Sequence, residues 1–332
     1  MKNYALSNFL NNYLTKKVKI IQTVVLSVFI LTSSLLSATH ESAGTTGFAF
    51  LKISYSARAM GMANAFTALS NDGDAVFFNP AGLRNNANIH VKASFINYLE
   101  DMKGGSIVYS TRYQELSIAP FFQFLVSDDI QQTKVVNGQF IDHLGTFQTS
   151  HIIIGTGFAK YINESLDLGF NIKYFYEKLF ENHTSTAIVT DLSLMHQPYI
   201  EELKIGATLK NLGYQLSYYT EAKYKEKMPL MLVLGASHKI KDKGFINLDV
   251  CKPFDNDFYG KIGCEYAMIN HLTLRTGVDT RFSDYQTNQS LDFLSGISFG
   301  IGLNWDKFIL DYGISSMGSF DLISQISISY LF

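Results

Sequence analysis

The residues best suited to catalysis form one short motif near the carboxyl end of the chain. Gly296, Ser298 and Gly300 match G-x-S-x-G, in which a serine nucleophile stands on a sharp turn between a strand and a helix. Here the motif lies inside an alternating segment that continues to Trp305, and no helical pattern follows it. The sequence therefore predicts no catalytic residue. An outer-membrane lipid hydrolase stays an unfavoured alternative, which would require Ser298 to meet a histidine in the fold.

Metal and redox chemistry are also not indicated. None of the eight histidines has a partner at metal-ligand spacing, and neither HExxH nor CxxC occurs. Cys251 and Cys264 lie on alternating segments whose parity directs them to opposite faces, so we expect no disulfide between them. The expectation is a protein without a metal or cofactor.

Charged residues recur on one face of the alternating segments, which we interpret as the lumen of a barrel. Both signs are present, so these groups either neutralise one another or form a polar path, such as an anchor for the head group of an amphiphile. Arg58 is the expected partner of Asp249, Asp279 or Asp311. The predicted lumen charges are Lys173, Glu177, Lys204, Lys210, Asp249, Arg275, Asp279, Asp306 and Asp311.

The elements that must position these charges are strands with a period of two. In residues 166–177, for example, leucine, isoleucine and aromatic residues alternate with Asp167, Gly169, Asn171 and Lys173. The polar face is rich in glycine, serine, threonine and asparagine rather than in lysine and glutamate, as a crowded lumen requires. Between residues 88 and 332 the pattern allows about fourteen strands of spanning length. We predict an all-β chain that forms a single transmembrane antiparallel β-barrel.

The last twelve residues carry the clearest strand of this kind. In residues 321–332, Ile326, Ile328, Tyr330 and Phe332 alternate with small polar residues, and the chain ends on the aromatic residue itself. A final strand with its apolar face toward lipid would close a barrel in a membrane. Tyr330 and Phe332 are therefore the predicted membrane-insertion residues.

The amino terminus has the pattern of an export signal. Four lysines precede an apolar run from Ile20 to Leu36, and Ser37 and Ala38 offer a small-residue cleavage site. We predict a cleaved signal peptide over residues 1–38. Its removal takes away four lysines and no acids, which leaves an acidic mature chain and argues against nucleic acid as a partner.

Residues 39–87 lack the alternating pattern and precede the predicted barrel of residues 88–332. Asn79 stands before Pro80, so it should be extended and should end any helix there. Irregular backbone at membrane depth survives only inside protein or water, so we predict that this segment is a hatch within the lumen.

Some stretches of the chain match a known family of proteins, namely residues 47–52, 56–62, 65–69, 79–83, 97–105, 210–216, 228–230 and 234–235. With these stretches the chain resembles the PorV/PorQ family of outer-membrane proteins, which is related to FadL-type transporters, and the PorQ branch in particular. The resemblance covers about residues 44 to 332, and its specific part is the amino-terminal block. It implies a barrel of about fourteen strands with a hatch. The hatch residues that it carries over are Arg58, Gly61, Asn64, Asn79, Pro80 and Gly82, with Gly61 and Gly82 for backbone freedom and Asn79–Pro80 to fix the turn.

The resemblance leaves two roles open. The favoured reading is a component of the type IX secretion system for protein export or surface attachment, with secretion-system proteins or exported cargo as partners. The alternative is a FadL-like transporter of hydrophobic small molecules, such as long-chain fatty acids, with such a molecule as its ligand. In both readings the chain contacts lipid in the bacterial outer membrane. The expected partner loops are residues 121–130 and 214–227.

Overall fold

The computed structural model describes residues 40–85, 89–141, 144–180, 183–285 and 292–332. The prediction of a signal peptide over residues 1–38 lies outside the described residues. No helix in the described part of the chain is long and apolar enough to cross a membrane.

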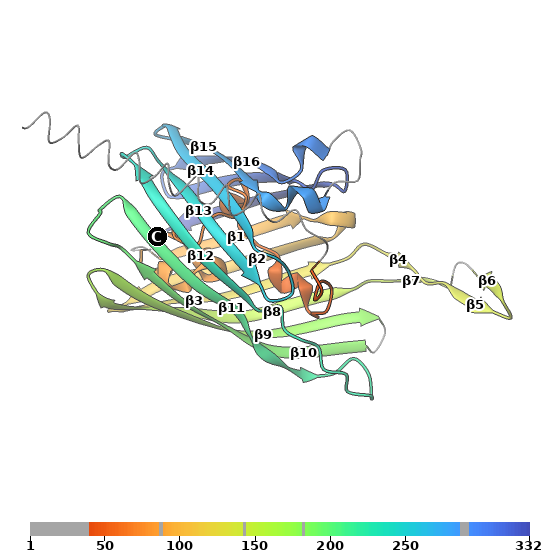
Figure 1. Cartoon of the computed structure of the whole chain (residues 1–332). Helices are drawn as coiled ribbons and strands as arrows, with labels where there is room; N and C mark the ends of the chain where they lie inside the picture. Colours follow the sequence, from red (N-terminus) through yellow and green to blue (C-terminus); the bar gives the residue numbers. More distant parts are fainter. Residues whose placement is uncertain (1–39, 86–88, 142–143, 181–182, 286–291) are drawn as a thin grey trace, which may run out of the picture. The chain divides into compact units, whose positions relative to one another are not determined.

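Fourteen antiparallel strands close into one barrel, as the alternating pattern predicted (Figure 1). Each strand pairs with its neighbour along the chain, and β1 (His90–Asn97) pairs with β18 (Leu322–Leu331) to complete the ring. The other barrel strands are β2 (Lys103–Tyr113), β3 (Leu116–Val126), β8 (Ser150–Asn163), β9 (Leu166–Phe180), β10 (His183–His196), β11 (Leu203–Ser217), β12 (Met231–Ile240), β13 (Gly244–Pro253), β14 (Tyr259–Ile269), β15 (Leu272–Asp279), β16 (Ile297–Trp305) and β17 (Phe308–Ser316).

Period-two alternation places apolar residues outside the barrel and polar residues inside. On β9, Leu168 and Ile172 expose 44% and 45% of their surface. Asn171 and Lys173, the two neighbours of Ile172 in the chain, expose only 1% and 6%. Side chains on a strand point alternately to its two faces, so successive residues lie by turns on the outside of the barrel and in its lumen.

The two ends of the barrel differ in the length of their connections. The end where β1 begins and β18 finishes carries short turns, such as residues 114–115, 164–165 and 306–307. We call it the turn end. The opposite loop end carries residues 98–102, 127–149, 218–230, 254–258 and 280–296.

A long two-stranded arm projects at the loop end between β3 and β8 (Figure 1). Its strands are β4 (Ile130–Gln131), β5 (Lys134–Val136), β6 (Gln139–Ile141) and β7 (Thr146–Phe147), paired β4 with β7 and β5 with β6. Most of the range 121–130, which was expected to be a partner loop, is strand β3, so that prediction is wrong for residues 121–126. The remaining short helices at the loop end are η3 (Leu99–Asp101), η4 (Thr280–Tyr285) and η5 (Asp292–Leu294).

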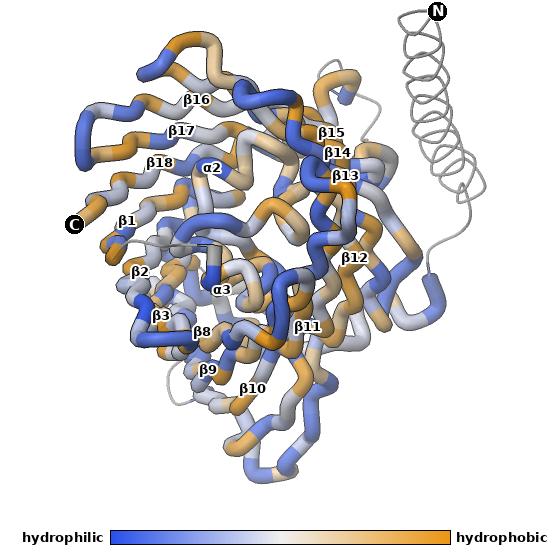
Figure 2. The backbone as a smooth tube through the Cα atoms, turned by 90° about the vertical axis from the view of Figure 1, so that its left-hand side faces the viewer, coloured by the Kyte–Doolittle hydropathy of each residue, from blue (hydrophilic) through white to orange (hydrophobic). Residues whose placement is uncertain are grey.

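The helices α2 and α3 lie inside the ring of strands (Figure 2), and we call residues 41–85, which contain them, the plug segment. Its short helices are η1 (Ala49–Lys52), α2 (Ala57–Met60), α3 (Ala75–Phe78) and η2 (Pro80–Asn85). Lys52 contacts Asp255 in the β13–β14 loop, and Arg84 contacts Asp167 near the start of β9. The plug segment therefore runs through the lumen from the loop end to the turn end.

Inward-facing glycines let the plug segment approach the barrel backbone closely. A Cβ on Gly313 would lie 2.4 Å from the carbonyl oxygen of Ala57, and one on Gly277 would lie 2.3 Å from the carbonyl carbon of Met62. Neither contact leaves room for a methyl group. The glycines in such contact come from eight strands and are Gly157, Gly169, Gly206, Gly235, Gly263, Gly277, Gly300 and Gly313. We call this set the glycine ring.

Candidate functional site

The described residues line a cavity in the lumen on each side of the plug segment. The loop-end cavity has a volume of about 320 Å³ and is bordered by Lys52, Tyr98, Arg281 and Met317 from the loops and the plug segment. The turn-end cavity has a volume of about 420 Å³ and is bordered by His90, Asn304 and Leu331 near the turns. The plug segment separates these two spaces.

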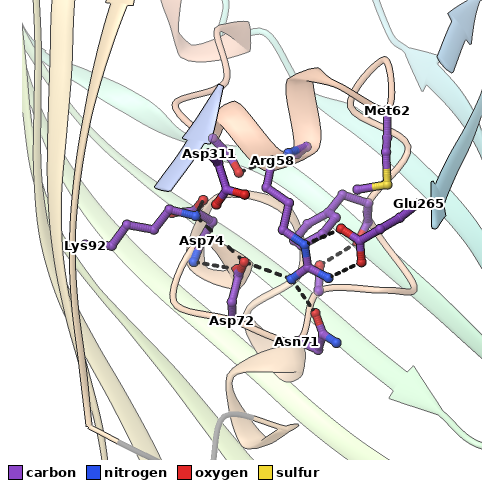
Figure 3. Close-up of polar contacts among 12 residues, drawn as sticks. Arg58, Met62, Asn71, Asp72, Asp74, Lys92, Glu265 and Asp311 are labelled. Atoms are coloured by element: carbon purple, nitrogen blue, oxygen red, sulfur yellow. Dashed lines mark hydrogen bonds and ion pairs between the residues drawn. The ribbon is translucent and has the colours of Figure 1, made fainter. Parts of the chain in front are cut away.

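Arg58 of α2 is the centre of an ion-pair network at the turn-end cavity (Figure 3). Its Nε and Nη2 donate to the two carboxylate oxygens of Glu265 on β14, at 2.8 and 2.7 Å. Its Nη1 donates to Asn71 Oδ1 at 2.8 Å and to Asp72 Oδ2 at 3.0 Å. A bidentate pair of this kind fixes orientation as well as charge, because the planar guanidinium matches the carboxylate.

The network continues from the plug segment to β1 through Lys92, whose side chain is 3% exposed. Lys92 Nζ pairs with Asp74 and lies 3.7 Å from Asp72 Oδ2. Burial opposes ionisation of Asp72, but Lys92 and Arg58 hold the pKa of that carboxyl below its ordinary value of 3.8. Burial raises the pKa of the Asp74 carboxyl to about 6, against the attraction of Lys92.

On the barrel side, Arg275 of β15 extends the same network. Its Nε donates to Glu265 Oε2 at 2.7 Å, and its Nη1 lies 2.8 Å from Asp311 Oδ1 on β17. Three cations and four carboxylates are thus linked in one chain of contacts from β1 to β17. Because each buried charge has an opposite charge beside it, the network binds the plug segment to the wall.

Arg58 pairs directly with Glu265 and Asp72 and with none of its three expected partners, so that prediction was wrong. Asp249 instead accepts hydrogen bonds from the Phe66 and Thr67 amides, both at 3.1 Å, and from the Thr67 hydroxyl at 2.7 Å. Asp279 pairs with Arg281. Asp311 belongs to the network, but it reaches Arg58 only through Arg275 and Glu265. Asp249 still joins the plug segment to the barrel wall, because its carboxylate accepts hydrogen bonds from backbone amides of the plug segment.

Lys173 lies in a second buried cluster, within the wall of β9 to β11. Its Nζ donates to both carboxylate oxygens of Asp191 and to Asn211 Oδ1, each at 2.9 Å. Asn211 has a φ of 62°, and the β10–β11 register shifts between Thr190 and Leu192. A β-bulge leaves backbone groups without ladder partners, and here Asp191 accepts the Asn211 amide at 2.7 Å.

The glycines carried over from the resemblance serve close packing rather than backbone freedom. Gly61 has an ordinary helical φ of −59°, and a Cβ there would lie 2.8 Å from Gly300 Cα. A Cβ on Gly82 would lie 2.0 Å from the Ser70 carbonyl oxygen. The expected reason was therefore wrong, although both positions do exclude a side chain.

The other carried-over residues lie at turns of the plug segment. Asn79 is extended, ends α3, and donates through Nδ2 to the carbonyls of Thr67 and Leu194 at 2.9 and 3.0 Å. Pro80 begins η2, where a missing amide costs nothing. Asn64 has a φ of 60° and borders the loop-end cavity.

The loop-end cavity combines an apolar wall with charged groups of both signs. Met231, Val233, Cys251 and Tyr259 form one buried cluster on β12 to β14 that borders it. Lys210 also borders the cavity and donates to the Phe77 carbonyl of the plug segment at 2.7 Å. Lys261 lies in register between Asp249 and Asp279 on the neighbouring strands. Such a space suits a small apolar molecule with a polar end.

A strap formed by residues 45–53 covers part of this cavity. The Thr46 hydroxyl and Lys52 Nζ both donate to Asp255 Oδ2 at 2.6 Å. Gly47 donates its amide to the Lys227 carbonyl at 3.1 Å. The Asp255 carboxyl is partly desolvated, yet the hydrogen bonds from Lys52 and Thr46 lower its pKa below 3.8. The strap therefore joins the β11–β12 and β13–β14 loops.

The carboxyl-terminal aromatics lie on the outside of the barrel at the turn end. The Tyr330 ring contacts Phe308 and Phe332, with ring centroids 5.0 and 4.7 Å apart. Phe332 is 63% exposed, and its amide donates to the Ile89 carbonyl at 3.1 Å. The final residue thus closes the ring next to the first strand.

Sequence reasoning missed Glu265, Lys92, Asp72 and Asp74. Lys261, Gly263 and Glu265 alternate with apolar residues, so the same parity argument would have placed Glu265 inside. Asp306 was expected in the lumen, but it is exposed in the β16–β17 turn with a φ of 51°. No pattern in the sequence predicts that Asp72 and Asp74 of the plug segment pair with Lys92.

Ser298 has none of the geometry of a nucleophile. It is 1% exposed on β16, and its hydroxyl donates to the Ser315 hydroxyl at 3.0 Å. Among the described residues, no histidine forms a hydrogen bond with it, and no group of three or more His, Cys, Asp or Glu side chains could hold a metal ion.

Solved structures with this architecture are outer-membrane channels. The toluene transporter TbuX of Ralstonia pickettii matches with a TM-score of 0.58 at 12% identity, over 84% of this chain and 98% of that one. A mutant of the TodX monoaromatic hydrocarbon channel matches with a TM-score of 0.55 at 14% identity, over 78% and 94%. A FadL homologue of Pseudomonas aeruginosa matches with a TM-score of 0.51 at 11% identity, over 84% and 98%.

No protein-family model matches the chain, and no curated protein matches it. At these identities the similarity establishes the fold, which is that of FadL-type barrels. The similar structures do not support membership of the PorV/PorQ family.

Proposed function

We propose that this protein is a bacterial outer-membrane channel for hydrophobic small molecules, in which the plug segment acts as a movable hatch. Residues 1–38 are removed on export, and the apolar outer face of the barrel contacts lipid. The observation that carries the proposal is the loop-end cavity, where buried apolar side chains of β12 to β14 face the plug segment. The FadL-type fold supports it.

The ligand enters from the loop end and occupies the loop-end cavity. Met60, Ile96 and Ile323 face the cavity opposite Met231 and Val233, so an apolar body has partners on both sides. Lys210 and Lys261 give the polar end of an amphiphile a place to bind. Onward passage requires the plug segment to move, because the glycine ring leaves no free space beside it.

Binding of radiolabelled toluene and radiolabelled oleate to the purified full-length barrel tests this proposal. Replacing apolar wall residues in Met231→Ser/Val233→Ser should weaken binding of a bound probe at least tenfold, because polar groups then replace its apolar contacts. Val108→Ser is the matched control, since Val108 is 1% exposed but packs in a different cluster. The proposal fails if neither probe binds, or if both variants bind as the wild type does.

A deletion strain separates the channel from the secretion reading. A hydrophobic-molecule channel predicts an unchanged surface and extracellular proteome and reduced uptake of a hydrophobic probe. Accumulation of exported proteins in the periplasm with normal probe uptake would instead support a secretion role.

A further inference from the structure

The two cavities share one sector of the barrel wall, formed by β1 and β18. Lys92 on β1 and Ser329 on β18 border the turn-end cavity. Ile96 and Ile323, on the same two strands, border the loop-end cavity. Only one or two inward-facing positions on each strand separate the cavities here, namely Ser94 on β1 and Gln325 and Ser327 on β18.

These intervening side chains are polar and deeply buried. Ser94, Gln325 and Ser327 are 8%, 1% and 2% exposed. The two serine hydroxyls and both polar atoms of the Gln325 amide have no hydrogen-bond partner among the described residues. Ser94 lies opposite Ser327 in the β1–β18 register, and Gln325 lies opposite Ile96, so the four atoms form one continuous group.

A group of this kind requires water. Leaving a buried hydroxyl or amide without a partner costs about 1–3 kcal/mol per group, and folded proteins avoid that cost by hydrating such sites. The requirement is strongest for Gln325, because an amide has both donors and an acceptor to satisfy.

The inner face of this sector presents side chains rather than glycines to the plug segment. The glycine ring draws on eight of the fourteen strands, and β1 and β18 are among the strands outside it. Neither strand contains glycine, and their inner face at this level carries serine and glutamine side chains. The plug segment therefore meets the hydrophilic strip through side chains.

An apolar cluster closes the strip at its loop-end side. Tyr55 and Met60 of the plug segment pack with Ile96 and Ile323, and all four are at most 7% exposed. A hydrophobic constriction in an otherwise polar path blocks water until it widens. The cluster joins the plug segment to both strands of the sector, so a small displacement of Tyr55 and Met60 would open it.

We propose that the β1–β18 sector is a second, aqueous pathway through this barrel, for water and small uncharged polar solutes such as glycerol. It runs from the turn-end cavity past Ser94, Ser327 and Gln325 to a gate of Tyr55, Met60, Ile96 and Ile323. It reaches the loop-end cavity on the side opposite the apolar cluster on β12 to β14, so the two pathways share that cavity and separate toward the turn end.

The test measures glycerol permeability of liposomes that contain the purified full-length protein, by stopped-flow light scattering. The gate variant Ile96→Ser/Ile323→Ser should raise permeability at least fivefold over the wild type. Adding Ser94→Val, Ser327→Val and Gln325→Leu to that variant should return it to the wild-type value. The matched control Ile153→Ser/Val189→Ser makes comparably buried apolar sites more polar in a different cluster, outside the sector and both cavities, and should leave glycerol permeability at the wild-type value.

Either of two results overturns the proposal. One is a folded gate variant, judged by its heat-modifiable mobility, that has wild-type permeability. The other is a raised permeability that persists after the three apolar substitutions. Toluene and oleate binding by the triple variant Ser94→Val/Ser327→Val/Gln325→Leu should equal that of the wild type, which separates this pathway from the proposed hydrophobic one.

A labelling experiment decides the matter if the gate variant does not fold. In a Cys251→Ser/Cys264→Ser background, Ser94→Cys should react with a water-soluble thiol reagent at least tenfold faster than Val189→Cys. Val189 is 0% exposed and lies in an apolar cluster of the plug and wall. Equally slow reaction at both positions would contradict a hydrated sector.

Discussion

Arg58 of the plug segment and Glu265 of the barrel wall form a bidentate ion pair, with donor–acceptor distances of 2.8 and 2.7 Å. The two residues are 207 positions apart in the chain. Glu265 also accepts from Arg275, so one carboxylate is shared by a plug cation and a wall cation. This contact makes the position of α2 depend on the wall strands β14 and β15.

Replacing Arg58 should loosen the plug segment. Arg58→Met leaves Asp72 with a more distant cation and should lower the free energy of unfolding by about 3 kcal/mol, since an unpaired buried charge is costly. Urea unfolding of the purified barrel in detergent checks this. Arg58→Lys should lower the free energy of unfolding by less than Arg58→Met does, because lysine keeps the positive charge although it lacks the forked guanidinium. Equal stability of Arg58→Met and wild type would show that the network does not hold the plug.

The glycine ring should be intolerant of even one methyl group. Gly277→Ala forces a Cβ to within 2.3 Å of plug backbone, so the plug must shift, at a cost of about 1–3 kcal/mol. We expect a higher ion conductance in planar bilayers. Gly73→Ala is the control, since its new Cβ would meet nothing closer than 3.4 Å. Identical conductance of the two variants would contradict close packing as the seal.

The strap should release in acid. The pKa of Asp255 is lower in the folded protein than its ordinary 3.8, so its bonds to Lys52 and Thr46 stabilise the strap above that value. This contribution is lost as the pH falls through the lowered pKa. The protection of residues 45–53 against hydrogen exchange, relative to the unstructured rate at the same pH, should therefore be lower below about pH 4 than at pH 7. Asp255→Asn should show lower protection at pH 7 and lose that pH dependence; wild-type protection that is unchanged in acid would argue against the strap contact.

The terminal aromatic residue should matter for assembly rather than for the finished barrel. Phe332→Ala removes an exposed ring from the lipid-facing strand end and should slow folding into lipid vesicles several-fold, because the closing strand then inserts less favourably. The appearance of the heat-modifiable band measures this rate. Phe293→Ala removes an equally exposed ring at the loop end and should have no effect. If both variants folded into vesicles with a similar delay, the cause would be a general loss of hydrophobicity and not the position of Phe332.

The barrel could be predicted from local pattern alone, and the site only in part. Alternation in residues 166–177 assigned Lys173 to the lumen and Ile172 to the outside, and burial agrees with both assignments. The same rule applied to residues 261–265 would have placed Glu265 inside. Which charges meet was not predictable, because Arg58 reaches Glu265 rather than Asp249, and Lys92 meets aspartates of the plug segment that have no strand parity.

The sequence by itself determined the fold class and the inward or outward direction of most strand residues, because side-chain direction in a regular strand depends on position within a period of two. The β-bulge at Asn211 shifts that parity, and only the structure revealed it. Tertiary structure decided the path of the plug segment, the partners of its charges and the separation of the two cavities. Those features depend on contacts that no local pattern encodes, such as the pair of Arg58 and Glu265, which are 207 positions apart in the chain.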